Sequence, residues 1–139
     1  MPLDLSSLQA AITALDEALT FARSPLMAQL TAAQRQTVQA GVIQCFECTY
    51  ELAWKMMKRW LEHNLESVYV DGVTRRALFR LAAEYQLIDD VTVWFDYHTT
   101  RNQTTPTHAL QIATEVFQMA PAFLDDVRGL LCQLQQKND

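Results

Sequence analysis

One stretch of the chain, residues 31–64, constrains the fold more than any other. It contains no proline, and its single glycine is Gly41. Thr31 and Gln34 have the spacing of a capping box, in which a hydroxyl and a side-chain amide satisfy free N–H groups at a helix start. A helix of about 33 residues is roughly 50 Å long at 1.5 Å per residue. The sequence therefore predicts one long helix from Thr31 to Asn64.

Apolar side chains cover a broad arc of this predicted helix. An arc near half of the circumference is wider than contact with one helix requires, so we expect the central rod of a bundle. Because Gly41 has no side chain, another helix is expected to approach closely there. The apolar arc comprises Val38, Val42, Ile43, Phe46, Tyr50, Ala53, Trp54, Met56, Met57, Trp60 and Leu61. The opposite strip is predicted to be a solvated face with i,i+4 ion pairs, and it comprises Gln44, Glu47, Glu51, Lys55 and Lys58.

The rest of the chain also has helical patterns separated by short breaks. One helix is expected over about 6–23, with Asp4 or Ser6 as its cap, and another over 73–86, with Asp71 as its cap. A further helix is expected to start at Asp89-Asp90 and to stop before Pro106. Residues 65–71 are expected to be an extended connector. A fifth helix, capped by Thr107, is expected to run to about Gln136, with Pro121 producing a kink. With 139 residues, half of them hydrophobic, and only three glycines, the chain is predicted to be all-α, a five-helix up-and-down bundle forming a single domain over 1–139.

Charge and cysteine content indicate which kinds of partner and site the protein can have. The formal net charge is −5, yet six of the eleven basic residues lie between Lys55 and Arg80; a local basic surface and an ordinary solvated face both fit, and short charge runs favour the second. Cys45, Cys48 and Cys132 have no second ligand pair near them, which favours free cysteines buried as small apolar residues over a metal site. Without a signal peptide or an apolar run of about 18 residues, a cytoplasmic protein without a membrane partner is expected. No motif for a cofactor is present.

Arg101 is the anomaly of the fourth predicted helix. On a helical wheel it lies between Trp94 and Tyr97, on an apolar stripe flanked by His98. A guanidinium on such a stripe is costly unless it is paired or faces a cleft. Two interpretations therefore stay open, a structural ion pair and a functional groove. In the second, Arg101, His98 and Tyr97 would bind the ligand.

Asn102 and His108 extend this candidate site. His108 follows Pro106, at the expected start of the fifth helix, where the helix dipole favours a neutral imidazole. Arginine, amide and histidine can bind a phosphate, or catalyse transfer at a phosphodiester with histidine as acid or base and arginine stabilising charge. The candidate catalytic residues are therefore Arg101, Asn102 and His108, with no metal ligands, although an isolated histidine is more often a surface residue.

Two blocks of sequence resemble a known family. The first is the run from Gly41 to Lys58, with Phe46-Glu47, Tyr50-Glu51-Leu52 and Trp54-Lys55-Met56-Met57-Lys58, and the second is Trp94, Tyr97, Arg101 and Asn102. They resemble the bacterial nucleotidyltransferase substrate-binding proteins of the HEPN superfamily. The resemblance implies a bundle similar to the C-terminal domain of kanamycin nucleotidyltransferase, and a homodimer. It also implies a minimal nucleotidyltransferase as partner, together forming a heterotetramer.

The resemblance also implies two possible functions. The superfamily's ribonuclease signature is an arginine, a polar residue beside it, and a histidine separated from the arginine by four to six residues, which Arg101, Asn102 and His108 match with six between. This family more often has four, and that position here is Pro106, while its tyrosine two residues beyond is also missing. We therefore expect a partner subunit that binds nucleotide or acceptor substrate. The alternative is a metal-independent ribonuclease that cleaves RNA as the toxin of a toxin–antitoxin pair, so whether the protein is an enzyme stays open.

Overall fold

The computed structural model describes residues 2–103 and 109–138, and within them every regular element is a helix. The α-helices are α1 (Ser6–Ala22), α2 (Ala32–Asn64), α3 (Arg75–Glu84), α4 (Val91–Asn102) and α5 (Ala109–Gln136). Two short 3₁₀ helices, η1 (Pro25–Gln29) and η2 (Ser67–Tyr69), lie in the connections on either side of α2. The predicted all-α, five-helix architecture is confirmed. Among the described residues, none of the helices has the length and apolar character needed to cross a membrane.

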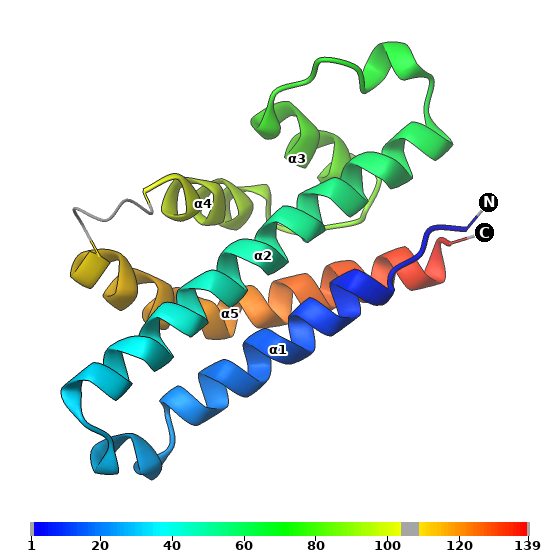
Figure 1. The fold of residues 1–139 in the computed structure, drawn as a ribbon. Coiled ribbons are helices and arrows are strands. Elements are labelled where there is room, and N and C mark those ends of the chain that lie inside the picture. Colours follow the sequence, from blue (N-terminus) through cyan, green and yellow to red (C-terminus); the bar gives the residue numbers. More distant parts are fainter. Residues whose placement is uncertain (1, 104–108, 139) are drawn as a thin grey trace.

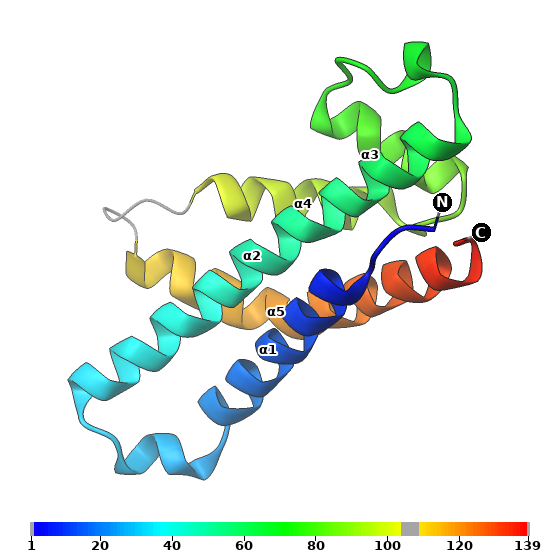
Figure 2. The ribbon, with the colours of Figure 1, turned by 45° about the vertical axis from the view of Figure 1, so that its right-hand side comes forward.

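Three long helices form the body of the molecule, and two short ones form an added layer. Helices α1, α2 and α5 pack on one another, whereas α3 lies against α2 and α4, and α4 contacts α2 and α5 (Figures 1 and 2). The two ends of the chain meet, because the backbone of Leu3 both donates to and accepts from the side-chain amide of Asn138, at 2.7 and 3.0 Å. The layer of α3 and α4 therefore rests on one side of a closed three-helix body.

Helix α2 begins as the sequence predicts. Gln34 N–H donates to Thr31 Oγ1 at 3.1 Å, and Thr31 N–H donates to Gln34 Oε1 at 2.9 Å, which completes the capping box. The expected close approach at Gly41 is wrong, since a Cβ there would meet nothing within 4 Å. Helix α1 packs along α2, and the hydroxyl of fully buried Thr49 lies 3.2 Å from the carbonyl oxygen of Ala11. The predicted burial of the cysteines is wrong for Cys48 and Cys132, which are exposed, while Cys45 is partly buried.

The start of each shorter helix can be compared with the capping residue predicted for it. The prediction that Asp71 caps the third helix is wrong, because α3 begins later and Thr74 Oγ1 accepts the Ala77 N–H at 3.1 Å. The residues between α2 and α3 are not fully extended, since they include η2. Helix α4 begins directly after Asp89-Asp90 as predicted, and Asp90 caps it by accepting the Thr92 N–H at 2.9 Å. Thr107 lies outside the described residues, and the kink at Pro121, inside α5, stays a prediction.

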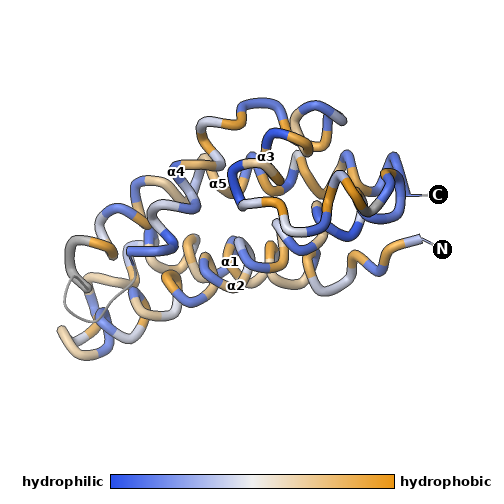
Figure 3. Tube along the Cα trace, turned by 90° about the horizontal axis from the view of Figure 1, so that it is seen from above, coloured by the Kyte–Doolittle hydropathy of each residue, from blue (hydrophilic) through white to orange (hydrophobic). Residues whose placement is uncertain are grey.

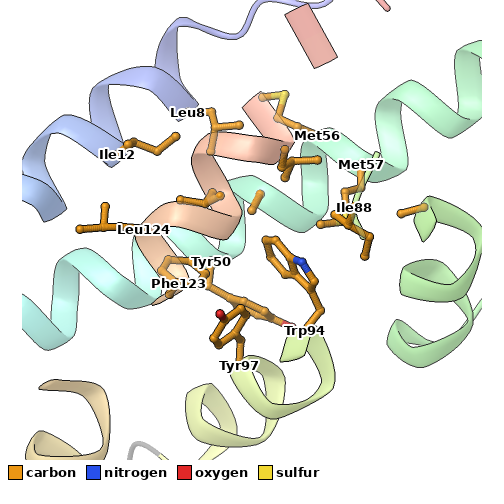
Figure 4. Close-up of a cluster of buried hydrophobic side chains, with 14 of the residues drawn as sticks. Leu8, Ile12, Tyr50, Met56, Met57, Ile88, Trp94, Tyr97, Phe123 and Leu124 are labelled. Atoms are coloured by element: carbon orange, nitrogen blue, oxygen red, sulfur yellow. The ribbon is translucent and has the colours of Figure 1, made fainter. Parts of the chain in front are cut away.

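The core is built from amphipathic faces. Figure 3 shows hydrophobic and hydrophilic positions alternating along the long helices, the pattern of helices with one buried side. At the centre, Tyr50 from α2, Trp94 and Tyr97 from α4, and Phe123 from α5 gather in one cluster (Figure 4). The Phe123 ring meets the Trp94 and Tyr97 rings edge to face, with centroids 6.0 and 4.9 Å apart. This cluster fixes the orientation of α4, and with it the site described next.

Candidate functional site

Arg101 lies at the boundary between α4 and α2, with about a third of its side chain exposed. Its Nε is 3.6 Å from Glu51 Oε1 and 4.0 Å from Glu47 Oε2. The two glutamates are one helical turn apart on α2, so both carboxylates reach the same guanidinium. The predicted ion pairs of these glutamates with Lys55 and Lys58 are wrong, since none is formed within the described part of the chain.

The ion pairs of Arg101 decide what charge this end of the site presents. Two carboxylates face one guanidinium, so the group as a whole carries about one negative charge at neutral pH. A phosphate that binds Arg101 must compete with both glutamates. The structure thus supports the ion-pair interpretation of Arg101 directly, and it leaves the arginine partly accessible to a ligand.

His98 lies between two hydrogen-bonding side chains. Its Nδ1 is 2.6 Å from the Tyr50 hydroxyl, and its Nε2 is 3.1 Å from the side-chain amide of Asn102, one turn later on α4. The Tyr50 hydroxyl also accepts a hydrogen bond from Arg75 Nη1 at 3.1 Å. A chain of contacts thus runs from α3 through α2 to the imidazole on α4 and to its exposed end.

Two proton arrangements satisfy this chain. In one, the Tyr50 hydroxyl donates to Nδ1, and Nε2–H donates to the amide oxygen of Asn102, which requires only a rotation of the amide by about 180°. In the other, Nδ1–H donates to Tyr50, and Nε2 accepts from the amide nitrogen of Asn102. Because a phenol can donate and accept, Tyr50 serves the ring in both tautomers and also when the ring is protonated.

The surroundings hold His98 neutral. Its pKa is lowered from the ordinary value of 6.5, first by burial and then by the positive charges of Arg75 and Arg76, with Arg101 adding to the effect and Glu51 opposing it. Burial likewise raises the pKa of Tyr50 to about 12, so its proton is retained at neutral pH. A neutral imidazole beside a protonated phenol can take or give a proton in a reaction.

Tyr97, predicted to bind ligand, faces away from this group. It is 3% exposed, and its hydroxyl donates to Asp126 Oδ2 on α5. Burial and the Asp126 carboxylate raise its pKa above the usual range. Tyr97 and His98 are neighbours in sequence, yet the structure places one in the core and the other at the α2–α3 side.

The other predicted residues divide in the same way. Asn102 is exposed at the end of α4 and contacts His98, so the structure brings Arg101, Asn102 and His98 to one place. His108 and Pro106 lie outside the described residues. Sequence reasoning missed Tyr50 and Arg75 as members of the group; Tyr50 was predicted only as a core residue, and the basic character of 55–80 was the one signal for Arg75.

Side chains around α3 add positive charge next to this group. The Arg75 guanidinium carbon lies 3.5 Å from the centroid of the Trp54 ring, and those of Arg76 and Arg80 lie 4.7 and 5.5 Å from the centroid of Phe95. On the other side of α4, between α4 and α5, there is a hollow of about 120 Å³ lined in part by Asp89, Asp90, Asp125 and Asp126. Of these two sides of α4, the α3 side is therefore the one that favours an anionic ligand.

Known proteins resemble this chain over most of its length. A curated relative from Haemophilus influenzae, named probable ribonuclease HepT, is 36% identical over 107 residues, which are 75% of this chain and 72% of the relative. The structure of HI0074 from the same species superimposes with a TM-score of 0.89 at 30% identity, covering 95% of this chain and 99% of that one. Its description states that it reveals the fold of a substrate binding domain of a nucleotidyltransferase.

A second solved structure shares the fold at lower identity. It comes from Thermus thermophilus and superimposes with a TM-score of 0.71 at 23% identity, covering 91% of this chain and 98% of that one. The sequence profile described as nucleotidyltransferase substrate binding protein like matches residues 3–136. The chain therefore belongs to the nucleotidyltransferase substrate-binding protein family, with the HI0074-like fold.

Proposed function

We propose that this protein is a ribonuclease whose reaction takes place at the end of α4. The observation that carries the proposal is the position of His98, a neutral imidazole held between Tyr50 and Asn102 and followed three residues later by Arg101. The relative named a probable ribonuclease supports the same activity. His108 follows the same arginine in the sequence, so it is the second candidate for the acid–base group.

The chemistry needs three groups, and the cluster has side chains for each. In RNA, the 2′-hydroxyl attacks the adjacent phosphorus, a P–O bond forms, and the bond to the 5′-oxygen breaks. The imidazole takes the proton of the 2′-hydroxyl, and protonated imidazole or water supplies a proton to the leaving oxygen. Arg101 stabilises the charge that develops on the phosphoryl oxygens, and Asn102 orients the phosphate by hydrogen bonding.

Cleavage of a labelled single-stranded RNA tests the proposal. Losing a transition-state contact of about 3 kcal/mol slows a reaction on the order of a hundredfold, so Arg101→Ala should lose activity by that factor. His98→Ala and His108→Ala then separate the two histidines, because only the acid–base residue gives a loss of that size. Circular dichroism and thermal melting of each variant check the fold. If the wild type, with and without EDTA, leaves the RNA intact, the ribonuclease proposal fails.

A second function is supported by the family itself. Its description and that of HI0074 both refer to a nucleotidyltransferase, so association with a small nucleotidyltransferase is also proposed here, with nucleotide or acceptor substrate held near Arg101. Homodimers that bind two such partners would form a heterotetramer. Sedimentation of this chain alone tests the homodimer. Co-expression with the product of the adjacent gene, followed by gel filtration, tests the pair, and separate elution at low and moderate salt would contradict it.

A further inference from the structure

Several cations lie over aromatic rings on the surface beside His98. We refer to it as the arginine–aromatic face, and it consists of Trp54 on α2, Arg75, Arg76 and Arg80 on α3, and Phe95 on α4. Lys55 adds a fourth positive charge, with Nζ 5.8 Å from the Trp54 centroid. Three helices contribute to this face, so it depends on the tertiary fold.

The charges of this face are available to a ligand. Within the described part of the chain, Arg75, Arg76 and Arg80 form no ion pair with a carboxylate, unlike Arg101 with its glutamates and Arg128 with Asp16. Arg76 and Arg80 are exposed. A guanidinium over an aromatic ring keeps its full charge and its hydrogen-bond donors, so these groups can bind an anion.

The face is continuous with the proposed reaction site. Phe95, His98 and Asn102 are three and four positions apart and therefore lie along one stripe of α4. The seven positions from Phe95 to Asn102 span about 10 Å of helix. Beneath the surface, Arg75 is also joined to His98 through the hydroxyl of the buried Tyr50, at 3.1 and 2.6 Å, so the surface path follows the stripe of α4. A chain molecule lying on the face would thus extend to the imidazole.

We infer that the arginine–aromatic face binds single-stranded RNA and leads it to His98. Single strands expose base faces that stack on aromatic rings and guanidinium planes, and their phosphates bind arginine, whereas a duplex hides its base faces. A local surface is required because the chain as a whole carries a net charge of −5 and Arg101 is held by two glutamates. The inference rests on the proposed function, and names its substrate class and the path of that substrate.

Binding is measured separately from cleavage. A fluorescent single-stranded RNA of about twelve nucleotides with 2′-O-methyl groups cannot be cut at the 2′-hydroxyl, and its anisotropy reports affinity at several salt concentrations. The double variant Arg76→Gln/Arg80→Gln is compared with Arg128→Gln, which removes an exposed arginine paired with Asp16 away from the face. Both changes are at exposed positions, so both variants are expected to fold, which thermal melting checks.

The expected result has three parts. The double variant binds the RNA about tenfold more weakly, and Arg128→Gln binds as the wild type does. The slope of log affinity against log salt becomes less steep by about 1.4, since each phosphate contact to a single strand contributes about 0.7. Arg76→Lys/Arg80→Lys keeps the salt slope and recovers only part of the affinity, because lysine supplies charge without the planar stack.

Several outcomes would overturn the inference. Unchanged RNA binding in the double variant would do so, as would equal affinity of the wild type for duplex and single strand. Failure of the wild type to bind the 2′-O-methyl RNA at low salt would also do so. Failure of the proposed function looks different: RNA would bind through the face but unmodified RNA would not be cleaved. If the double variant cleaves RNA with the same KM as the wild type, the proposed reaction site is supported and the proposed role of the arginine–aromatic face is contradicted.

Discussion

The two sides of α4 differ in chemistry although they belong to one twelve-residue helix. On the α5 side, Trp94 is 1% exposed and Tyr97 is 3% exposed, and the adjoining hollow carries aspartates. On the α3 side, Phe95 and His98 are only partly buried and face arginines. The α5 side holds the helix in the core, and the α3 side presents titratable groups to solvent.

The contrast shows how an acidic protein can offer a surface to an anion. The hollow lined by Asp89, Asp90, Asp125 and Asp126 repels phosphate, whereas Arg75, Arg76 and Arg80 attract it. One helix separates these charges, so the overall net charge of −5 says little about either side. The orientation of α4 about its own axis therefore decides which residues meet a ligand.

Truncation of the two aromatic residues at the start of α4 should give the largest difference in stability. Trp94→Ala removes a fully buried ring that contacts Phe79, Tyr97 and Phe123, and should lower the free energy of unfolding by about 3–5 kcal/mol. Phe95→Ala should lower it by less, because that ring is already partly in water. Urea denaturation measures both. Equal losses would mean that both sides of α4 are core.

The two tyrosines test whether the sides differ in function as well. Each of Tyr50→Phe and Tyr97→Phe removes one hydroxyl and the hydrogen bonds that it forms, so each should lower the free energy of unfolding by about 1 kcal/mol. Only Tyr50→Phe removes a contact to His98, so only that variant should slow RNA cleavage, by about tenfold. Equal cleavage rates in the two variants would show that the contact to Tyr50 does not position the imidazole.

The negative charge next to Arg101 should weaken the binding of RNA on the α3 side of α4. Glu51→Gln keeps an acceptor for the Trp54 indole N–H, 3.0 Å away, but removes the nearer negative charge from Arg101. The partly exposed ion pair contributes little stability, while affinity for the 2′-O-methyl RNA should rise about threefold. Glu62→Gln, an exposed change on the same helix, is the control. Weaker binding in Glu51→Gln would mean that the carboxylate orients Arg101 for its ligand.

The sequence predicts the α5 side of α4 better than the α3 side. Apolar periodicity and capping residues predict helices and buried faces because those signals are local. The helical wheel identified Arg101 as anomalous, yet its partners on α2 are about fifty positions away, and no local pattern names them. The same holds for His98, whose contact with Tyr50 depends on how α2, α3 and α4 pack.

The contacts of the basic residues from 55 to 80 could not be predicted from the sequence either. The sequence shows how many there are, but a short run of charges by itself favours an ordinary solvated face. The structure shows guanidinium groups over Trp54 and Phe95, contacts between helices that a charge count cannot predict. The candidate His108 remains a sequence prediction, because it lies outside the described residues.

The smallest effect expected is a shift in the titration of His98. NMR of the ring should give a pKa below 6.5, since burial and the arginines of α3 favour the neutral form. Arg75→Ala should raise that pKa, and Glu51→Gln should lower it further, because the Glu51 carboxylate opposes the shift. The two variants thus move the same ring in opposite directions, which a general loss of structure would not do.

The lowered pKa of His98 also predicts how the stability of the protein changes with pH. A histidine whose pKa is lower when folded takes up its proton more readily when unfolded, so its contribution is present above pH 6.5 and is lost as the pH falls through the folded pKa. Between about pH 7.5 and 5, the free energy of unfolding should therefore fall more in the wild type than in His98→Gln. Chemical denaturation at each pH measures the difference. Equal falls, with a pKa at or above 6.5, would mean that neither burial nor the arginines of α3 lower the pKa of this ring, which would contradict the electrostatic contrast between the two sides of α4.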